Sequence, residues 1–532
     1  MMEMPGQNKN PTKKRRLTRE EIGFLIFIPS VLFGAYLRLY LPAISGFPIN
    51  DGALFLKMIE GIQQNNFALP FYVEYNRLEI PFAYPPLAFY IAGAVGVFFR
   101  IPSIQVITWM PAIVLALTLP FVFHLARLVT NSTFQAGIAI FFYAFLPRTA
   151  WWLIMGGGVT RSLGNLFLVL AASQLYLLIT RKQRIYIISS IIFCSLVCLS
   201  HPEAALHTAM TGALIWFIFD KKIGGVKNGL VVALGTLTLT SPWWALIVSR
   251  FGFSPFLSAG KTGFHSFVVI FQFLDNFAGE QLLTFISVLA FLGLFHQVSK
   301  RQAFLPAWFI LPFILEPRNA PNVVVIPMCI LASVYLTETV LPGLSANEQL
   351  VRGTSGRPFA VPTAAILFAY LSISLLVGMF MFDFNLSTKK VSADTLDAFE
   401  WINNNTPKEA GFLVITGSPN LFSDHNNEWF PYLADRKSLT TIQGMEWLQN
   451  IDFEEKNDLL IAIQNCVNSP ETLECIETNI SENRLDFDYI VVQKNGKNIG
   501  NLLSELLRED SYKKVYETAE SAVFLKQPGR GN

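Results

Sequence analysis

Long apolar runs, broken by short polar or basic connections, fill the sequence from residue 22 to residue 382. A straight transmembrane helix needs about 20 apolar residues. Because the segments 83–99 and 134–147 are shorter, we predict about eleven crossings and one re-entrant or broken stretch. Pro147 and Gly156-Gly157-Gly158 mark such a break, which is tolerated at membrane depth where it lines a cavity. The apolar segments are 22–41, 83–99, 104–126, 134–147, 163–180, 184–200, 203–219, 226–247, 282–298, 303–315, 320–340 and 360–382.

After Lys389 the pattern changes to the shorter periods of a soluble α/β domain, which we place at residues 388–532. Amphipathic spacing predicts helices, and short runs of apolar, β-branched residues predict buried strands. The first helix ends before Pro407, which cannot continue it. The predicted elements are a helix at 394–402, strands at 412–415 and 489–493, a helix near 502–507 and a terminal hairpin formed by 515–517 and 523–526.

Composition supports a membrane body. Of the 532 residues, 52% are apolar and 15% are charged, against about 25% charged in an ordinary soluble domain. A water-soluble fold cannot bury that much apolar surface, which excludes a soluble enzyme, a fibrous protein and a disordered chain. Charge divides the chain at the same place: residues 1–387 hold 26 of its 40 Lys and Arg and 15 of its 38 Asp and Glu, whereas residues 388–532 hold 14 and 23.

Positive charges predict the orientation. The cluster Lys13-Lys14-Arg15-Arg16 precedes a first apolar run without a clear cleavage site, which favours a retained helix over a signal peptide. Basic segments favour the cytoplasm, so residues 1–21 lie inside. We predict a multi-pass plasma-membrane protein with a transmembrane module at 22–387, a first outer loop at 43–86 and the domain 388–532 outside. The other connections assigned to the cytoplasm are Arg181-Lys182-Arg184, Lys221-Lys222-Lys227, Lys300-Arg301 and Arg352 with Arg357.

The first outer loop holds the strongest candidate for chemistry. Asp51, in Pro48-Ile49-Asn50-Asp51-Gly52, directly follows the first helix and lies at the boundary of membrane and water. Acids near the membrane are functional candidates by default, and partial desolvation makes a carboxylate a better general base. The alternative is a helix-capping Asp beside a Gly turn. Tyr84-Pro85-Pro86 shapes the end of the same loop, or is a rigid junction between loop and helix.

Further polar residues face the same side in this topology. His201 and Glu203 are candidates for a polar pair near the site, although an intramembrane His more often satisfies a neighbouring backbone group. Arg250, Lys261 and His265 belong to the loop 248–281 and contact either a phosphate group or lipid headgroups. A short interfacial helix is expected at 264–275. No nucleotide-cradling loop or zinc spacing is present, and the one basic cluster is explained by topology, so nucleic-acid binding has no support.

The order of these elements resembles the GT-C class of integral membrane glycosyltransferases, including bacterial mannosyl- and arabinosyltransferases. A first-loop acid, the Tyr84-Pro85-Pro86 element and a C-terminal outer domain are shared, and Glu316-Pro317-Arg318-Asn319 before Val323-Val324-Val325-Ile326-Pro327 looks like the late-helix element of the class. Segments at 428–436 and 444–447 look like tail segments of bacterial members. The resemblance implies that Asp51 activates the acceptor or helps to hold a metal, that Arg318 grips the carrier phosphate, and that Tyr84 shapes the entrance.

One departure bears on metal dependence. Metal-dependent oligosaccharyltransferases of the class carry a second outer acid, but the corresponding stretch here, 147–161, has no Asp or Glu. Because a divalent cation needs several oxygen ligands, we expect neither a metal nor another cofactor.

The expected function is transfer of a sugar from a polyprenyl-phosphate donor, drawn from the membrane lipid, to an unknown glycan, lipid or protein acceptor on the extracytoplasmic face. Asp51 is the expected general base, and Arg318 the phosphate ligand. The alternatives are a transporter or flippase of a lipid-linked solute and an inactive GT-C-like scaffold. Spans almost free of Asp and Glu, with polar groups gathered on one face, favour an enzyme over a transporter.

Two cysteines lie in the predicted outer domain. Cys466 and Cys475 flank a turn containing Asn468-Ser469-Pro470, between two predicted helices. A helical hairpin of this length can bring two Cα atoms within the ~4.4–6.8 Å that a disulfide needs, and disulfides persist outside the cytoplasm. We therefore predict a Cys466–Cys475 disulfide; the alternative is a pair of free thiols. Cys194, Cys198 and Cys329 lie in apolar segments and are most simply small core residues.

Overall fold

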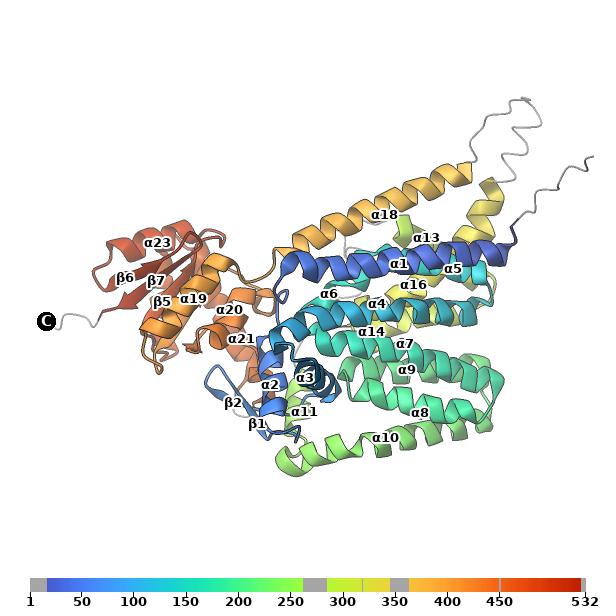
Figure 1. The fold of residues 1–532 in the computed structure, drawn as a ribbon, viewed down its shortest axis with the longest axis horizontal. Helices are drawn as coiled ribbons and strands as arrows, with labels where there is room; N and C mark the ends of the chain where they lie inside the picture. Colours follow the sequence, from blue (N-terminus) through green and yellow to red (C-terminus); the bar gives the residue numbers. More distant parts are fainter. Residues whose placement is uncertain (1–16, 262–284, 318, 345–362, 449–450, 528–532) are drawn as a thin grey trace, which may run out of the picture.

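A computed structural model describes residues 17–261, 285–317, 319–344, 363–448 and 451–527. Figure 1 shows long helices running side by side along the longest axis of the molecule, with the sheet-containing part of the chain at one end of them. We call residues 43–86 the first loop and residues 388–532 the tail domain. The fold is a polytopic helical body joined to a mixed α/β domain, as the sequence predicts.

The helical body is built from apolar helices. Within the described residues, six are long and apolar enough to cross a membrane, and a bent pair makes a seventh; four apolar helices are shorter. The number of eleven crossings stays a prediction. The lengthwise helices are α1 (Arg19–Ser45), α4 (Ser103–Thr130), α5 (Thr133–Phe145), α7 (Gly158–Arg181), α8 (Ile185–Cys198), α9 (Pro202–Phe219), α10 (Ile223–Phe251), α13 (Phe285–Ser299), α14 (Phe304–Leu315), α16 (Val325–Tyr335) and α18 (Thr363–Ser387).

The chain breaks where Pro147 and the three glycines predict it. Helix α5 is followed by a short helical piece, Pro147–Ile154, at an angle of 81°. That piece consists of η1 (Pro147–Thr149) and α6 (Trp151–Ile154), after which α7 begins at Gly158. The other short segment forms α3 (Leu87–Phe99), which Figure 1 shows nearly end-on while α1 and α4 run lengthwise. Thirteen helical residues reach only about 20 Å, so α3 is too short to cross alone.

The tail domain contains a five-stranded mixed sheet of order β4-β3-β5-β7-β6. β3 is parallel to β4 and β5, whereas β7 is antiparallel to β5 and β6, so the predicted terminal hairpin is confirmed. Strand β3 is buried along its whole length because helices cover the sheet. The strands are β3 (Gly411–Ile415), β4 (Lys437–Ser438), β5 (Tyr489–Gln493), β6 (Tyr512–Glu517) and β7 (Ser521–Lys526), and the helices are α19 (Ala393–Asn405), α20 (His425–Leu433), α21 (Phe453–Asn465), α22 (Thr472–Glu482) and α23 (Ile499–Arg508).

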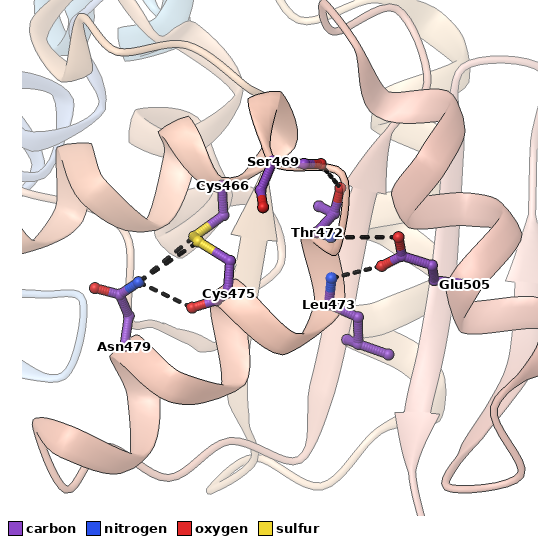
Figure 2. The surroundings of a disulfide bond; sticks show 7 residues. All are labelled: Cys466, Ser469, Thr472, Leu473, Cys475, Asn479 and Glu505. Carbon is purple, nitrogen blue, oxygen red and sulfur yellow. Dashed lines mark hydrogen bonds between the residues drawn. A yellow bond between two sulfur atoms is a disulfide. The ribbon is translucent and has the colours of Figure 1, made fainter.

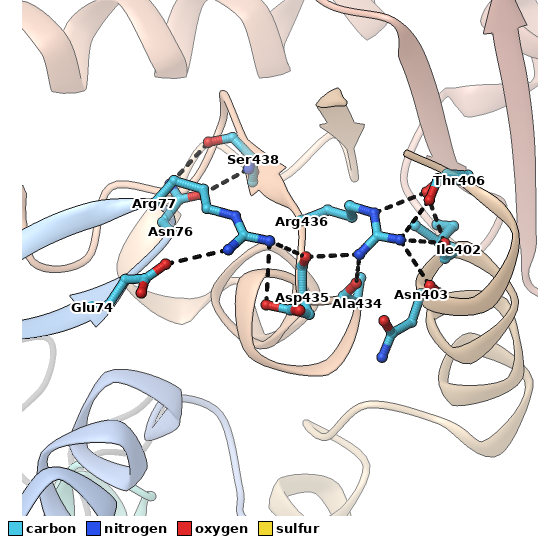
Figure 3. A network of polar contacts seen from close by, with 10 residues as sticks. All are labelled: Glu74, Asn76, Arg77, Ile402, Asn403, Thr406, Ala434, Asp435, Arg436 and Ser438. Carbon is cyan, nitrogen blue, oxygen red and sulfur yellow. Dashed lines mark hydrogen bonds and ion pairs between the residues drawn. The ribbon is translucent and has the colours of Figure 1, made fainter. Parts of the chain in front are cut away.

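The tail domain is fastened to the first loop. That loop contains α2 (Ala53–Gln64) and a hairpin of β1 (Tyr72–Tyr75) and β2 (Leu78–Pro81). At the tip of the hairpin, Asn76 exchanges two hydrogen bonds with the backbone of Ser438, and Arg77 donates to the carbonyl oxygen of Asp435. Figure 3 shows these contacts beside Arg436, whose guanidinium donates to carbonyl oxygens at the end of α19. The first loop and the tail domain are therefore joined to each other at one end of the helical body (Figure 1).

A disulfide closes the loop between α21 and α22. Cys466 and Cys475 have an S–S distance of 2.01 Å and a Cα–Cα distance of 5.6 Å, within the range that such a bond requires. Figure 2 shows Asn479 donating to the carbonyl oxygen of Cys475. On the other side, the Glu505 carboxylate accepts from the first backbone N–H groups of α22 and satisfies donors that a helix start leaves open.

Candidate functional site

Asp51 lies at the junction of α1, the first loop and the tail domain. The chain leaves α1 at Gly46 and enters α2 after Gly52, so Asp51 comes one residue before the helix cap. Its neighbours are held from two sides: the Asn50 N–H donates to the carbonyl oxygen of Lys389, and the Gly156 N–H donates to that of Ile49, each at 2.8 Å. The position of this carboxylate therefore depends on both the tail domain and the break before α7.

Asp51 forms an ion pair with Arg161. The Oδ2 of Asp51 lies 2.5 Å from Nη2 of Arg161, and its Oδ1 accepts from the Gly157 N–H at 3.2 Å. A Cβ on Gly156 would collide with the backbone carbonyl of Asp51, and one on Gly157 with both charged side chains. The glycines thus allow a close approach that no larger residue would permit, a role beyond the break that the sequence predicts.

Two arginines stack on two consecutive tryptophans at the same place. The Arg161 guanidinium lies 4.1 Å from the centroid of the Trp152 ring, and that of Arg148 lies 5.0 Å from that of Trp151. Both arginines are buried. Cation–π stacking fixes a guanidinium plane while leaving its N–H edge for another ligand. From the sequence, this stretch is noted for its chain break and its missing acids, and these two arginines are not predicted as site residues; arginines inside an apolar segment were the signal that could have identified them.

Glu428 from the tail domain holds the start of α2. Its buried carboxylate accepts from the N–H groups of Gly52, at 2.8 and 3.0 Å, and of Ala53, at 3.1 Å. A helix start favours a negative charge there. Complete burial, with the nearby charge of Asp51, nevertheless raises the pKa of Glu428 well above its ordinary value, against the opposing effect of the backbone donors. From the sequence, Glu428 is noted only as part of a tail segment, because its partners at the start of α2 lie more than 370 positions earlier in the chain.

These groups face a cavity of about 810 Å³ between the helices, the first loop and the tail domain. It contains the ion pair and the second arginine, and its walls include several Phe, Tyr and Trp side chains. Its other side is formed by a turn of the tail domain. The lining includes Asp51, Arg148, Arg161, Trp152, Tyr84, His201, Glu203, Glu428, Gln443, Glu446 and Trp447.

Four of the residues singled out from the sequence meet in this cavity: Asp51, Tyr84, His201 and Glu203. The Tyr84 hydroxyl lies 3.4 Å from that of Thr160, close to the ion pair. The Nδ1 of His201 accepts from the Ala204 N–H and caps α9. His201 therefore both caps this helix and lines the cavity.

Three other predicted residues lie differently. Arg250 is not among the lining residues: its Nη1 donates to the carbonyl oxygens of Leu69 and Pro70, and its guanidinium stacks on Phe71. Arg250 therefore holds the first loop through these two carbonyl oxygens and is not part of the cavity lining. Lys261 is the last residue of α11 (Ser254–Lys261), whose residues Ala259 and Gly260 line the cavity. Arg318 and the expected helix at 264–275 lie outside the described residues.

Comparison with known proteins identifies the fold. No protein-family model matches the chain, and no curated protein matches it in sequence. Solved structures do match: the oligosaccharyltransferase AglB from Archaeoglobus fulgidus, in complex with an inhibitory peptide and a dolichol-phosphate, at TM-score 0.57 and 14% identity over 97% of this chain and 75% of that one. ArnT from Cupriavidus metallidurans, bound to undecaprenyl phosphate, matches with a TM-score of 0.53 and 13% sequence identity. The match covers 94% of this chain and 97% of ArnT. The arabinofuranosyltransferase AftD from Mycobacteria matches with a TM-score of 0.52 and 13% sequence identity. The match covers 94% of this chain and 40% of AftD.

The fold is that of the GT-C glycosyltransferases. The likeness extends over nearly the whole chain, including the tail domain. Identities of 13–14% establish the architecture and leave the reaction, the substrates and the catalytic residues to be argued from the site.

The A. fulgidus oligosaccharyltransferase was also solved in complex with Zn and sulfate, so we tested whether the residues of this site fit a metal ion. Among the described residues of this chain, no three His, Cys, Asp or Glu side chains gather in a way that could hold a metal ion. Asp51 faces a guanidinium and a backbone N–H, and the Glu428 carboxylate, which senses the charge of Asp51, accepts from backbone donors. This donor set does not fit a divalent cation, which needs several free oxygens.

Proposed function

We propose that this protein transfers a sugar from a polyprenyl-phosphate donor to an acceptor hydroxyl, with Asp51 as general base. One observation carries the proposal: in a GT-C fold, a carboxylate and two buried arginines share one large cavity. An acid and cations side by side match the two charges that such a transfer moves, a proton from the acceptor and an anion on the leaving group.

The proposed step is a single displacement. The acceptor oxygen forms a bond to the anomeric carbon while the bond from that carbon to the phosphate oxygen breaks, and the acceptor proton passes to Asp51. The electron pair of the broken bond stays on the carrier phosphate, and the anomeric configuration inverts. The Gly157 N–H and Arg161 hold the two oxygens of Asp51 in place, so the base is oriented before substrates bind.

The leaving phosphate is assigned to the arginine side of the cavity. Arg148 and Arg161 present planar guanidinium groups that can each contact two phosphate oxygens. Stacking on Trp151 and Trp152 fixes those planes, while Nη2 of Arg161 also donates to Asp51. Arg318, assigned from its sequence context, remains a third proposed ligand of the carrier phosphate, and Lys261 and Glu203 remain proposed substrate contacts.

The carrier chain would enter from the lipid side. Leu206 and Leu315 line the cavity, yet they keep 49% and 55% of their surface exposed. Exposed apolar side chains of this kind suit contact with lipid or with an apolar carrier tail. The cavity thus joins an apolar edge, suited to a polyprenyl tail, to a polar interior suited to its phosphate and sugar.

We place the reaction on the extracytoplasmic face. The end of α7 away from the cavity carries the basic residues Arg181 and Lys182, and Lys182 pairs at 2.9 Å with Asp220, which follows the corresponding end of α9. Basic residues concentrate on the cytoplasmic side, which puts the cavity on the opposite side.

The direct test uses purified full-length protein in lipid nanodiscs with polyprenyl-phosphate sugars labelled in the sugar. Release of free carrier phosphate together with a labelled product supports transfer. Movement of intact donor between the leaflets of proteoliposomes, without cleavage, would instead establish a flippase. A protein that neither cleaves nor moves any of these donors would be an inactive scaffold. Asp51→Asn is the matched variant for the first outcome.

A further inference from the structure

One part of the cavity wall belongs to the tail domain. It is formed by a turn that contributes Gln443, Glu446 and Trp447. The turn is fitted to the first loop at Gly444, which has φ +91 and whose absent side chain leaves room for Ile80 and Leu54. This wall is therefore anchored by close packing, although it belongs to a different part of the chain from the ion pair.

The turn holds one buried polar atom without a hydrogen-bond partner in the described part of the chain. Gln443 is buried; its Nε2 donates to the carbonyl oxygen of Leu421, while its Oε1 has no hydrogen-bond partner among the described residues. Asn322, on the helical side of the cavity, also has a buried, unpartnered Oδ1 within the described part of the chain. A buried acceptor without a donor costs free energy, so both oxygens suit a ligand rich in hydroxyl donors.

Aromatic residues belong to the same lining. The Trp447 ring packs edge-to-face against Tyr84, with centroids 5.6 Å apart; both residues line the cavity, and Trp447 keeps 6% of its surface exposed. Phe422 continues the surface from the tail domain and is 39% exposed. A flat apolar ring next to open acceptors matches a sugar ring, which has an apolar C–H face and a rim of hydroxyls. A wholly apolar acceptor would leave the oxygens of Gln443 and Asn322 unsatisfied.

We propose that the acceptor is a saccharide, bound by the tail-domain turn with its ring against Trp447 and its hydroxyls donating to Gln443 Oε1. The assignment rests on the proposed function for calling this ligand the acceptor. It divides the cavity into a phosphate side, with Arg148 and Arg161, and a saccharide side, with Asp51 between them. The tail domain then sets acceptor specificity, and the membrane helices recognise the donor.

The test measures saccharide binding without the donor, by saturation-transfer NMR on full-length protein in nanodiscs. The probes are methyl glycosides and disaccharides of mannose, galactose, glucose, arabinose and N-acetylglucosamine, with a Ser/Thr peptide as comparison. We expect at least one saccharide to bind, its affinity to fall about tenfold or more in Trp447→Ala and Gln443→Met, and Trp447→Phe to retain part of it. Trp401→Ala is the matched control, because that ring stacks on Tyr516 in the same domain, away from the cavity lining.

The outcomes separate this inference from the proposed function. No binding by any saccharide, equal loss in Trp401→Ala, or binding of the peptide alone would overturn the saccharide assignment. Transfer of the donor sugar to the peptide would do the same while supporting the transferase. Saccharide binding that depends on Trp447 and Gln443, in a protein that cleaves no polyprenyl-phosphate sugar, would keep the subsite and refute the transferase.

Discussion

Asp51 and Arg161 face each other at 2.5 Å across 110 residues of chain. The Arg161 side chain keeps 8% of its surface exposed and that of Asp51 keeps 18%, so the pair is largely removed from water. A buried charge that loses its partner is costly. The carboxylate proposed as the base is therefore also part of what holds the break before α7 against the first loop.

Asp51→Asn should lower the transfer rate by about 10²–10⁴-fold, the usual loss of a general base. Since the change leaves the charge of Arg161 without its partner, stability should also fall, by less than the about 3–5 kcal/mol of a fully buried pair. The double variant Asp51→Asn/Arg161→Gln should recover stability and remain inactive. Transfer assays and thermal unfolding measure the two effects, and near wild-type transfer by Asp51→Asn would refute the proposed role.

Arg148 should act on the donor. We expect Arg148→Ala to lose more donor affinity than Arg148→Lys, because lysine keeps the charge but cannot contact two phosphate oxygens in one plane. Titration with a non-transferable polyprenyl phosphate measures the affinity. Arg508→Ala, an exposed arginine of α23, is the matched control and should bind like the wild type. Identical affinities for all four proteins would reassign Arg148 to a structural stack on Trp151.

Removing divalent cations should leave transfer largely intact, because the described donors around Asp51 do not fit a metal. The measurement is the transfer rate after EDTA treatment and gel filtration. Complete loss of activity, restored by Mn²⁺ or Mg²⁺, would show that other residues complete a metal site.

The helical body and most elements of the tail domain could be predicted from local patterns, although α20 and β4 were not. Long apolar runs, the break at Pro147 and the terminal hairpin each depend on neighbouring residues, and Asp51 stood out because it directly follows a span. The partners of Asp51 could not be found this way. Arg161, Glu428 and the Gln443 turn meet it only through the packing of three separate parts of the chain, which periodicity does not encode.

Glu428 gives the site a pH dependence. Its pKa is raised in the folded state, mainly by burial and then by the charge of Asp51. A raised carboxyl pKa contributes stability below its ordinary value, 4.5, and this contribution is lost as pH rises through the folded value. As pH increases from 4.5, the melting temperature of the wild type should therefore fall relative to that of Glu428→Gln. Glu454→Gln, at an exposed position of α21, should show no such trend, and parallel curves for all three proteins would contradict the assignment.

The Cys466–Cys475 disulfide tests the placement of the tail domain independently of activity. Its Cα–Cα distance of 5.6 Å lies in the range of disulfides, and closing so short a loop contributes roughly 2–3 kcal/mol at most. A cytoplasmic domain would leave the pair reduced. In denaturant without reductant, we expect a maleimide reagent to label Cys194, Cys198 and Cys329, which are free, and to label Cys466 and Cys475 only after reduction. Mass spectrometry of the labelled peptides reads out each site. If both tail cysteines react fully before reduction, the bond is absent in the cell and the assignment of this domain to the outer face loses its support.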